Sequence, residues 1–154
     1  MAKERHRVYI ACYLYLKKDG KVLLSRRFNA AYQNGNYTMV SGHIEEGENA
    51  ITAMAREAKE EAGIDIALDD LRVVHLVQRL GPDREYVDFY LTADKWKGEP
   101  RNMEPDKCDD LGWFDFNKLP KNIVGYIPVV IRKIEAGQIY TQYDEREELK
   151  ARGA

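Results

Sequence analysis

Cysteine is scarce in this sequence of 154 residues, which contains only two. Cys12 and Cys108 lie far apart and belong to no CxxC pattern, so neither a zinc site nor a disulfide framework is expected. We expect both thiols to be buried in the core or partly buried.

The sequence also lacks a large excess of charge of one sign. Its formal net charge is −2, whereas proteins that grip nucleic acid along many phosphates are usually strongly basic. The charge balance therefore argues against nucleic acid as a partner. It leaves open a small anionic substrate that local arginine or lysine residues and a metal ion would neutralise.

Long hydrophobic runs and Gly/Ser-rich or Pro-rich linkers are absent as well. The apolar stretch at residues 8–16, VYIACYLYL, is too short to span a membrane and is followed by no cleavage-like site, which favours a buried strand. We expect no membrane association, a cytoplasmic location, and one domain over residues 1–154.

The chain alternates β-rich runs with two helical segments. The turn signal at residues 17–20 predicts that the first two strands form a hairpin. Residues from about 138 to 154 are expected to be a polar tail, frayed or folded as a short surface helix. This order predicts an α+β sandwich with a mixed sheet and helices on its faces. The expected strands are residues 7–16, 21–26, 37–40, 71–80, 85–96 and 111–116, and the expected helices are residues 48 or 49 to 63 and 127–136.

The segment from residue 42 to 64 combines a glycine-flanked loop with a helix. Asn49 can cap the free N–H groups at the helix start, and Gly63 tolerates the left-handed conformation that ends many helices. At 100° per residue, an apolar stripe separates from an acidic face. The stripe comprises Ile51, Ala55, Ala58 and Ala62, and the acidic face comprises Glu57, Glu60 and Glu61.

The acidic face is electrostatically unfavourable by itself. Glu57 forms like-charge pairs with Glu60 and Glu61 at helical spacings, and all three lie toward the helix C-terminus, where the helix dipole favours cations. A positive group is therefore expected beside them. Carboxylate oxygens suit hard divalent cations such as Mg²⁺ or Mn²⁺, but from spacing alone a solvated acidic face is an equally open interpretation.

The spacing of charged and glycine residues in this segment is long, free of gaps and specific. The positions concerned are Gly42, Glu48, Arg56, Glu57, Ala58, Glu60, Glu61, Gly63 and Ile64. They resemble the Nudix box, which is a glycine, five residues, glutamate, seven residues, Arg-Glu, an aliphatic residue, any residue, Glu-Glu, any residue, glycine and an aliphatic residue. Ala58 replaces a bulkier aliphatic residue. Ser41 stands where the family often adds a backbone carbonyl as a metal ligand, although the usual Pro-Gly-Gly is replaced here by Val-Ser-Gly.

The resemblance implies a Nudix-type α/β/α sandwich and a function. That function is hydrolysis of a nucleoside diphosphate linked to another moiety, with water attacking the P–O–P bridge and Mg²⁺ or Mn²⁺ held by Glu57, Glu60, Glu61 and Ser41. A nucleoside triphosphate pyrophosphohydrolase of MutT type is the favoured member. A nucleotide-sugar, ADP-ribose or dinucleoside polyphosphate hydrolase is the alternative, followed by a non-catalytic nucleotide-binding module. The general base stays open among the glutamates.

Residues outside the box are further candidates. The resemblance implies that Arg27 contacts substrate phosphate, since arginine presents a planar fork of donors. Glu99 and Glu104 lie in the region where family members often have a glutamate that reaches the metals or activates water. Glu104 is predicted as a catalytic group and Glu99 as a substrate-binding group, and the sequence does not decide which one reaches the site.

Two charged residues of the box have a different expected role. By helical geometry Glu48 and Arg56 lie away from the acidic face, so they are expected to pair around the loop and orient the ligands. Family members often dimerise, so the resemblance implies a homodimer.

Overall fold

A mixed five-stranded sheet lies at the centre of this computed structural model, in which residues 1–153 are described. The strand order is β5-β1-β7-β6-β9; β1 runs parallel to β7 and β6 parallel to β9, while the other neighbours are antiparallel. The strands are β1 (Tyr9–Leu14), β5 (Ser41–His43), β6 (Arg72–Leu80), β7 (Glu85–Thr92) and β9 (Tyr140–Asp144).

A second, smaller sheet is built around β3 (Lys21–Arg27). It pairs antiparallel with β2 (Lys17–Lys18), β4 (Tyr37–Thr38) and β8 (Cys108–Asp115). The predicted hairpin of the first two strands is therefore much shorter than expected, because β1 itself pairs with β5 and β7 in the main sheet. Much of β1 is buried on both faces, which is typical of a central strand and explains the difference.

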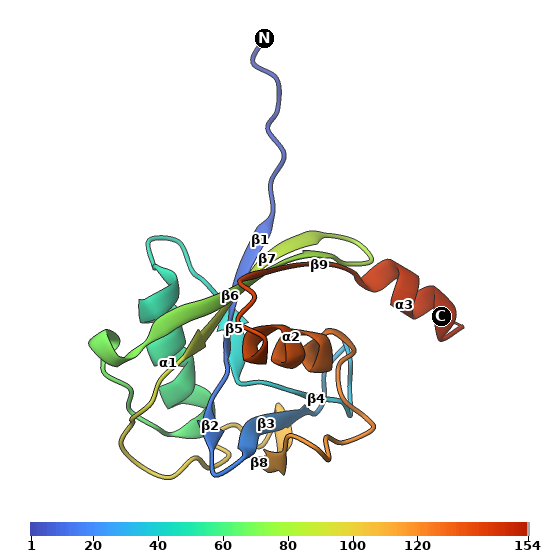
Figure 1. Ribbon diagram of the computed structural model, residues 1–154. Helices are drawn as coiled ribbons and strands as arrows, with labels where there is room; N and C mark the ends of the chain where they lie inside the picture. Colours follow the sequence, from blue (N-terminus) through green and yellow to red (C-terminus); the bar gives the residue numbers. More distant parts are fainter. Residues whose placement is uncertain (154) are drawn as a thin grey trace.

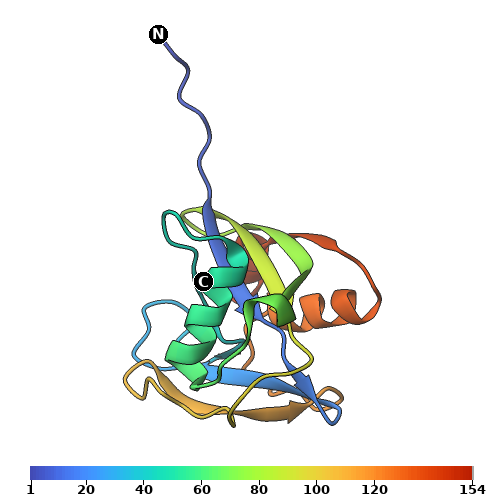
Figure 2. The ribbon, with the colours of Figure 1, turned by 90° about the vertical axis from the view of Figure 1, so that its left-hand side faces the viewer.

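Helices α1 (Ala50–Ala62) and α2 (Tyr126–Glu135) cover opposite faces of the main sheet, as Figure 1 shows. Successive side chains of β1 point to opposite faces of the sheet. Tyr13 packs in the core under α2, whereas Cys12 and Leu14 pack in the core under α1. Figure 2 shows α1 in front of the sheet. The expected sandwich of helices on a mixed sheet is confirmed.

Local rules set both ends of α1. The side chain of Asn49 accepts a hydrogen bond from the backbone N–H of Thr52 at 2.9 Å, and Gly63 adopts a φ of 67° at the C-cap. The fully buried helix residues are Ala53, Met54, Ala58 and Ala62. Ile51 and Ala55 of the predicted stripe are only partly buried. The buried face is thus rotated toward Met54.

The segment expected to be a polar tail contains the short helix that was one of the two possibilities, but a strand precedes it. Residues 140–144 form β9, which pairs with β6, and the short helix α3 (Glu145–Ala151) follows. Glu145 is completely buried, although it stands in a charged stretch. The segment is therefore part of the main sheet, and buried Glu145 forms an ion pair with Arg79 of β6.

Of the other expected elements, the strand at residues 37–40 is reduced to β4, and β5 after it was not predicted. The 3₁₀ turn η1 (Leu68–Asp70) precedes β6, and Pro128 lies in the first turn of α2. Cys12 is buried and Cys108 is partly buried, and both are free thiols. None of the helices in residues 1–153 has the length and apolar character needed to cross a bilayer.

Candidate active site

Strand β5 places Gly42 directly against the side chain of Glu57. A Cβ atom at residue 42 would lie 2.0 Å from Oε1 of Glu57, so a larger residue there would force the Glu57 side chain to move. Burial raises the pKa of Glu57, and the neighbouring Arg56 opposes that rise. The first glycine of the motif thus allows the Glu57 carboxylate to lie directly against β5.

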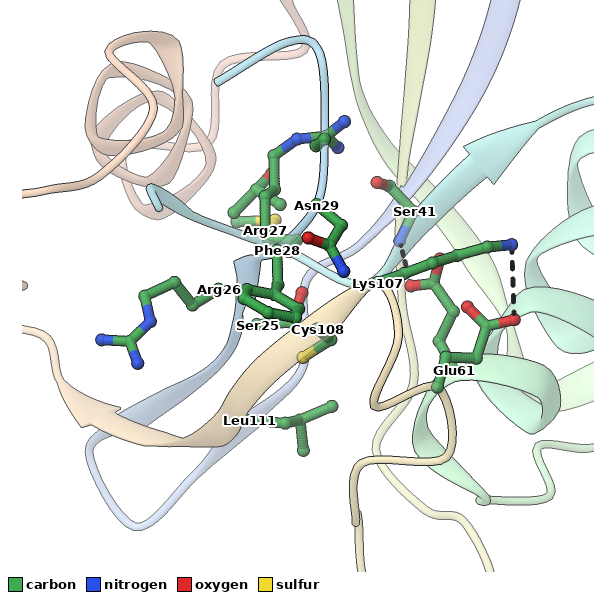
Figure 3. Close-up of a pocket in the computed structure, with 14 residues that line it drawn as sticks. Ser25, Arg26, Arg27, Phe28, Asn29, Ser41, Glu61, Lys107, Cys108 and Leu111 are labelled. Atoms are coloured by element: carbon green, nitrogen blue, oxygen red, sulfur yellow. Dashed lines mark hydrogen bonds and ion pairs between the residues drawn. The ribbon is translucent and has the colours of Figure 1, made fainter. Parts of the chain in front are cut away.

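Glu61 lies one helical turn after Glu57 and faces the same strand. Its Oε2 accepts a hydrogen bond from the backbone N–H of Ser41 at 3.2 Å, and Figure 3 shows this contact. Burial, followed by the charge of Glu57, raises the pKa of Glu61 to about 8, while the Ser41 N–H and Arg27 act in the opposite direction. The surroundings of Glu61 therefore disfavour its ionised form.

The loop between β7 and β8 brings Glu104 to the same place. The charge of Glu104 contributes to the raised pKa of both Glu57 and Glu61. Glu99 lies elsewhere: its side chain is 80% exposed and faces Lys18 at 3.6 Å. Of the two loop candidates, the structure brings Glu104 together with the α1 glutamates and leaves Glu99 outside.

Backbone hydrogen bonds hold this loop in place. The N–H of Met103 donates to the carbonyl of Glu61 at 3.1 Å, at the C-terminal end of α1, where carbonyl groups lack helical partners. The side chain of Asn102 accepts from the N–H of Glu104 at 3.0 Å and donates to the carbonyl of Cys108 at 2.6 Å. The position of Glu104 is thus coupled to the end of the helix that carries the other carboxylates.

Arg56 corrects one prediction. It was expected to lie away from the acidic face, yet its guanidinium contacts Glu57 at 2.8 Å and Glu60 at 3.4 Å. Helical angles describe where a Cα points, whereas the long arginine side chain reaches across neighbouring positions. Arg56 is the positive group that the crowded glutamates required.

The expected pairing of Glu48 with Arg56 is present. Two nearly parallel hydrogen bonds of 2.8 and 2.9 Å join the guanidinium to the Glu48 carboxylate. The Arg56 contact and the backbone N–H of Glu45 lower the pKa of Glu48 to about 2. This bidentate pair ties the loop after β5 to α1.

Glu60 has a more peripheral position than its two neighbours. Its side chain is 51% exposed, against 12% for Glu57, and it forms an ion pair with Arg56. Glu60 therefore stands at the rim of the acidic cluster, and Glu57, Glu61 and Glu104 form its interior.

Arg27 lies opposite the carboxylates, at the end of β3. Its Nε donates to the carbonyl of Tyr32 at 2.8 Å, and its guanidinium lies 5.5 Å from the centre of the Tyr32 ring. The adjacent Arg26 instead binds Asp109 at 2.7 Å and points away from the site (Figure 3). Of the two strand-end arginines, Arg27 is the one positioned toward Glu61.

Two pockets meet at this point. The Phe28 pocket, of about 310 Å³, contains Glu61 and Glu104, and its remaining wall includes Phe28, Asn29 and Lys107. The Tyr86 pocket, of about 570 Å³, is lined by Tyr32, His43, Arg79, Arg84, Tyr86 and Glu145 among others. Arg27 and Ser41 are the residues that line both pockets.

A buried charged cluster closes the floor of the Tyr86 pocket. Arg79 pairs with Asp88 at 2.7 Å and with Glu145 at 3.1 Å, and Glu145 also accepts from the hydroxyl of Tyr32. Sequence reasoning missed this cluster. The signal for Asp88 was a lone acidic residue in the apolar strand run EYVDFYL, whereas nothing in its charged segment distinguished Glu145.

Comparison with known proteins identifies the family. The NUDIX domain family matches residues 5–133, most of the chain. The chain belongs to the Nudix domain family. A solved structure of similar size is the MutT NUDIX hydrolase of Burkholderia pseudomallei, with a TM-score of 0.76 and 26% identity, covering 82% of this chain and 98% of that one. The MutT protein of Methanosarcina mazei, with a TM-score of 0.74 and 16% identity over 87% and 97% of the two chains, shows the same fold.

Two curated relatives are more similar in sequence. The NAD-capped RNA hydrolase NudC of Vibrio atlanticus is 30% identical over 116 residues, which is 74% of this chain and 40% of the relative. The ADP-ribose pyrophosphatase of Methanocaldococcus jannaschii is 30% identical over 106 residues, 69% of this chain and 61% of the relative. This Nudix chain thus spans about half of the length of these relatives.

Members of the Nudix family generally use divalent metal ions, and the donor set here fits such an ion in its chemistry. Glu57, Glu61 and Glu104 offer carboxylate oxygens, the ligands that Mg²⁺ and Mn²⁺ prefer, and they repel one another. As the side chains lie, no three His, Cys, Asp or Glu residues among residues 1–153 converge into a ready metal site. Instead, the Arg56 guanidinium forms ion pairs with the carboxylates of Glu57 and Glu60.

Proposed function

We propose that this Nudix protein is a metal-dependent hydrolase that cleaves the P–O–P bridge of a nucleoside diphosphate linked to another moiety. The observation that carries the proposal is that Glu61 and Glu104 line the same pocket as Arg27, at the point where two pockets meet, with Glu57 one helical turn before Glu61. A diphosphate at this junction lies beside a phosphate-binding cation and beside carboxylates suited to divalent ions.

Each group has a proposed task. Glu57 and Glu61, with Glu104 and the Ser41 carbonyl, would hold Mg²⁺ or Mn²⁺, and Glu60 at the rim would complete the set. When bound, such an ion neutralises phosphate oxygens and lowers the pKa of bound water. Arg27 orients the phosphate through its planar donors. A carboxylate not committed to metal accepts the proton of the attacking water.

The identity of the substrate has two candidates. The curated relatives are named for ADP-ribose and for NAD-capped RNA, and this supports a diphosphate that carries a group on each side. The likeness to the MutT hydrolase of Burkholderia pseudomallei supports the second candidate, a nucleoside triphosphate pyrophosphohydrolase of MutT type. The net charge of −2 favours a small nucleotide over a long RNA.

A substrate panel tests the proposal. Product release is measured from normal and oxidised nucleoside triphosphates, ADP-ribose, nucleotide sugars, diadenosine polyphosphates and NAD⁺, with Mg²⁺, with Mn²⁺ and with EDTA. We expect turnover that needs metal and that Glu57→Gln abolishes, while the exposed Glu147→Gln control retains it. Binding of nucleotide without any turnover would favour the non-catalytic module instead.

Two further expectations accompany the proposal. A homodimer is proposed because members of the family often form dimers. Sedimentation of the purified chain distinguishes a dimer from a monomer. A cytoplasmic location is likewise a proposal, which fractionation of the source cells would test.

A further inference from the structure

We propose that Glu145, the first residue of α3, is a positioning residue for Arg27 and acts on it through Tyr32. This inference rests on the proposed function, in which Arg27 binds the substrate phosphate. It brings in a part of the chain that the family match does not include, because the NUDIX domain match ends at residue 133 and β9 and α3 follow it.

Glu145 itself is held in place by a buried guanidinium. Its side chain is fully buried, and Oε2 accepts a hydrogen bond from Nη1 of Arg79 at 3.1 Å. Two hydrogen bonds of 2.7 and 3.3 Å to Asp88 orient Arg79 in turn. Figure 1 shows β9 leading directly into α3, and Asp144 at the end of β9 is paired in register with Leu80 of β6. The carboxylate of Glu145 is therefore fixed relative to the main sheet.

The other oxygen of this carboxylate holds the loop at residues 28–36, which joins β3 to β4. Oε1 of Glu145 accepts a hydrogen bond from the hydroxyl of Tyr32 and lies 3.5 Å from Nε2 of Gln33. Gln33 has a φ of 53°, in the left-handed region that residues other than glycine seldom adopt. Strained backbone of this kind persists only where the surroundings fix it. The contacts with Glu145 are such surroundings, and they fasten the tip of the loop to α3.

Tyr32 in turn fixes the guanidinium of Arg27. Its carbonyl accepts a hydrogen bond from Nε of Arg27 at 2.8 Å, and its ring centre lies 5.5 Å from the guanidinium. The backbone of Arg27 also closes the loop, since its N–H donates to the carbonyl of Asn36 at 3.0 Å and its carbonyl accepts from the N–H of Gly35 at 2.8 Å. Nε is thus used within the protein, and the terminal nitrogens of the fork are left for a phosphate. A group fixed in this way before the substrate arrives binds more tightly, because less ordering is needed on binding.

A positioning role and a purely stabilising role of Glu145 differ in what they predict. Glu145→Ala does not separate them, because it removes a partner of buried Arg79 and can prevent folding. Tyr32→Phe is more selective. It removes the hydroxyl that Glu145 holds, but it keeps the Tyr32 carbonyl and ring beside Arg27 and leaves the ion pair of Glu145 with Arg79 intact.

The test is a double-mutant cycle on the whole protein. kcat and KM are measured, with Mg²⁺, for the panel substrate that has the highest kcat/KM. We expect Tyr32→Phe to raise KM about fivefold with kcat changed by less than about twofold, since a less well held Arg27 loses binding that ground state and transition state share. In the Arg27→Ala background, the same substitution should change KM by less than about twofold, because the group on which it acts is gone.

The matched control is Tyr143→Phe. It removes a hydroxyl that donates to the carboxylate of Glu148 at 2.7 Å, also in the C-terminal segment, and Tyr143 lines neither the Phe28 pocket nor the Tyr86 pocket. KM should be unchanged in this variant. An unchanged KM in Tyr32→Phe, or an equal rise with and without Arg27, would overturn the inference. The hydrolase function would stand in either case, because it rests on metal-dependent turnover.

A binding measurement replaces KM where turnover is absent. If the Arg27→Ala variants alone are inactive, or if no substrate is turned over and the hydrolase function fails, the Kd of ADP-ribose with Mg²⁺ is measured by calorimetry in the same variants. A Kd about fivefold weaker in Tyr32→Phe, seen only when Arg27 is present, supports the inference. An unchanged Kd, or no binding at all, rejects it.

Discussion

Two arginines in this protein each gather carboxylates, and the two groups differ in burial. In the Arg79 cluster the arginine side chain is 4% exposed, and its partners Asp88 and Glu145 are not exposed at all. In the Arg56 cluster the arginine is 26% exposed, and its partners Glu48, Glu57 and Glu60 range from 12% to 51%.

The difference shows how one kind of ion pairing serves two purposes. The Arg79 cluster joins β6, β7 and the start of α3, away from water, so its charges need one another to remain in place. The carboxylates of the Arg56 cluster are partly exposed. In the proposed metal site, Glu57 would exchange its arginine partner for the metal ion. Four predictions test this comparison.

The largest expected effect is on the Arg79 cluster. Arg79→Met should lower the free energy of unfolding by about 3–5 kcal/mol, because it leaves two buried carboxylates without compensation and removes a cation that lies 4.1 Å from the Tyr86 ring. Urea unfolding measures it. The matched control is Arg72→Met, which breaks an exposed pair with Asp94 and should cost less than about 1 kcal/mol. Equal losses of unfolding free energy in Arg79→Met and Arg72→Met would contradict the difference between the buried cluster and an exposed ion pair.

The next effect concerns the contact between Gly42 and Glu57. Gly42→Ala should displace the Glu57 carboxylate and lower kcat/KM by about 100-fold, because the new methyl group would lie 2.0 Å from Oε1 and the flexible Glu57 side chain would have to move. Gly112→Ala is the control, since a Cβ there meets no atom within 4 Å. The hydrolysis assay checks this, and a variant as active as Gly112→Ala would contradict it.

The third prediction is a pH dependence of the metal-free protein. Glu61 has a pKa of about 8 when folded, against about 4.3 in an unfolded chain. The stabilising contribution of its protonated form is complete below pH about 4.3 and is lost as pH rises toward 8. In EDTA, stability should fall by about 2 kcal/mol between pH 5.5 and 7.5.

Thermal unfolding at several pH values measures this fall. Glu61→Gln, which cannot ionise, should not show that component of the pH dependence. The same pH dependence in wild type and variant would mean that another group is responsible.

The smallest effect is expected in the Arg56 cluster. Arg56→Lys keeps the charge but loses the double hydrogen bond to Glu48, and should cost no more than about 1 kcal/mol of unfolding free energy, as partly exposed ion pairs do. Urea unfolding of Arg56→Lys and Arg79→Met under the same conditions compares the two losses of unfolding free energy. A loss as large as that of Arg79→Met would show that the Arg56 cluster is as fixed as the buried one.

The sequence predicted features that depend on neighbours along the chain. Asn49 and Gly63 act within one helical turn, so the ends of α1 could be placed from the residues alone. The spacing of the box residues brought Glu57 and Glu61 to one face of α1 by helix geometry. The order of strands and helices predicted the sandwich of helices on a mixed sheet, and the resemblance implied the same architecture.

Features that depend on distant partners were missed or left open. The place of β1 between β5 and β7 depends on pairings that no local turn signal reveals. The burial of Glu145 depends on Arg79, 66 positions away. The choice between Glu99 and Glu104 required the path of a loop that docks on the end of α1.

The most direct test of the account compares Glu104→Gln with Glu99→Gln. The two variants make the same chemical change in the same loop, but only Glu104 lies with Glu57 and Glu61. The measurement is kcat/KM for ADP-ribose with Mg²⁺. The account predicts a loss of at least about 100-fold for Glu104→Gln and a change within about twofold for Glu99→Gln. The reverse pattern, or equal losses, would contradict the assignment of Glu104 to the carboxylate centre.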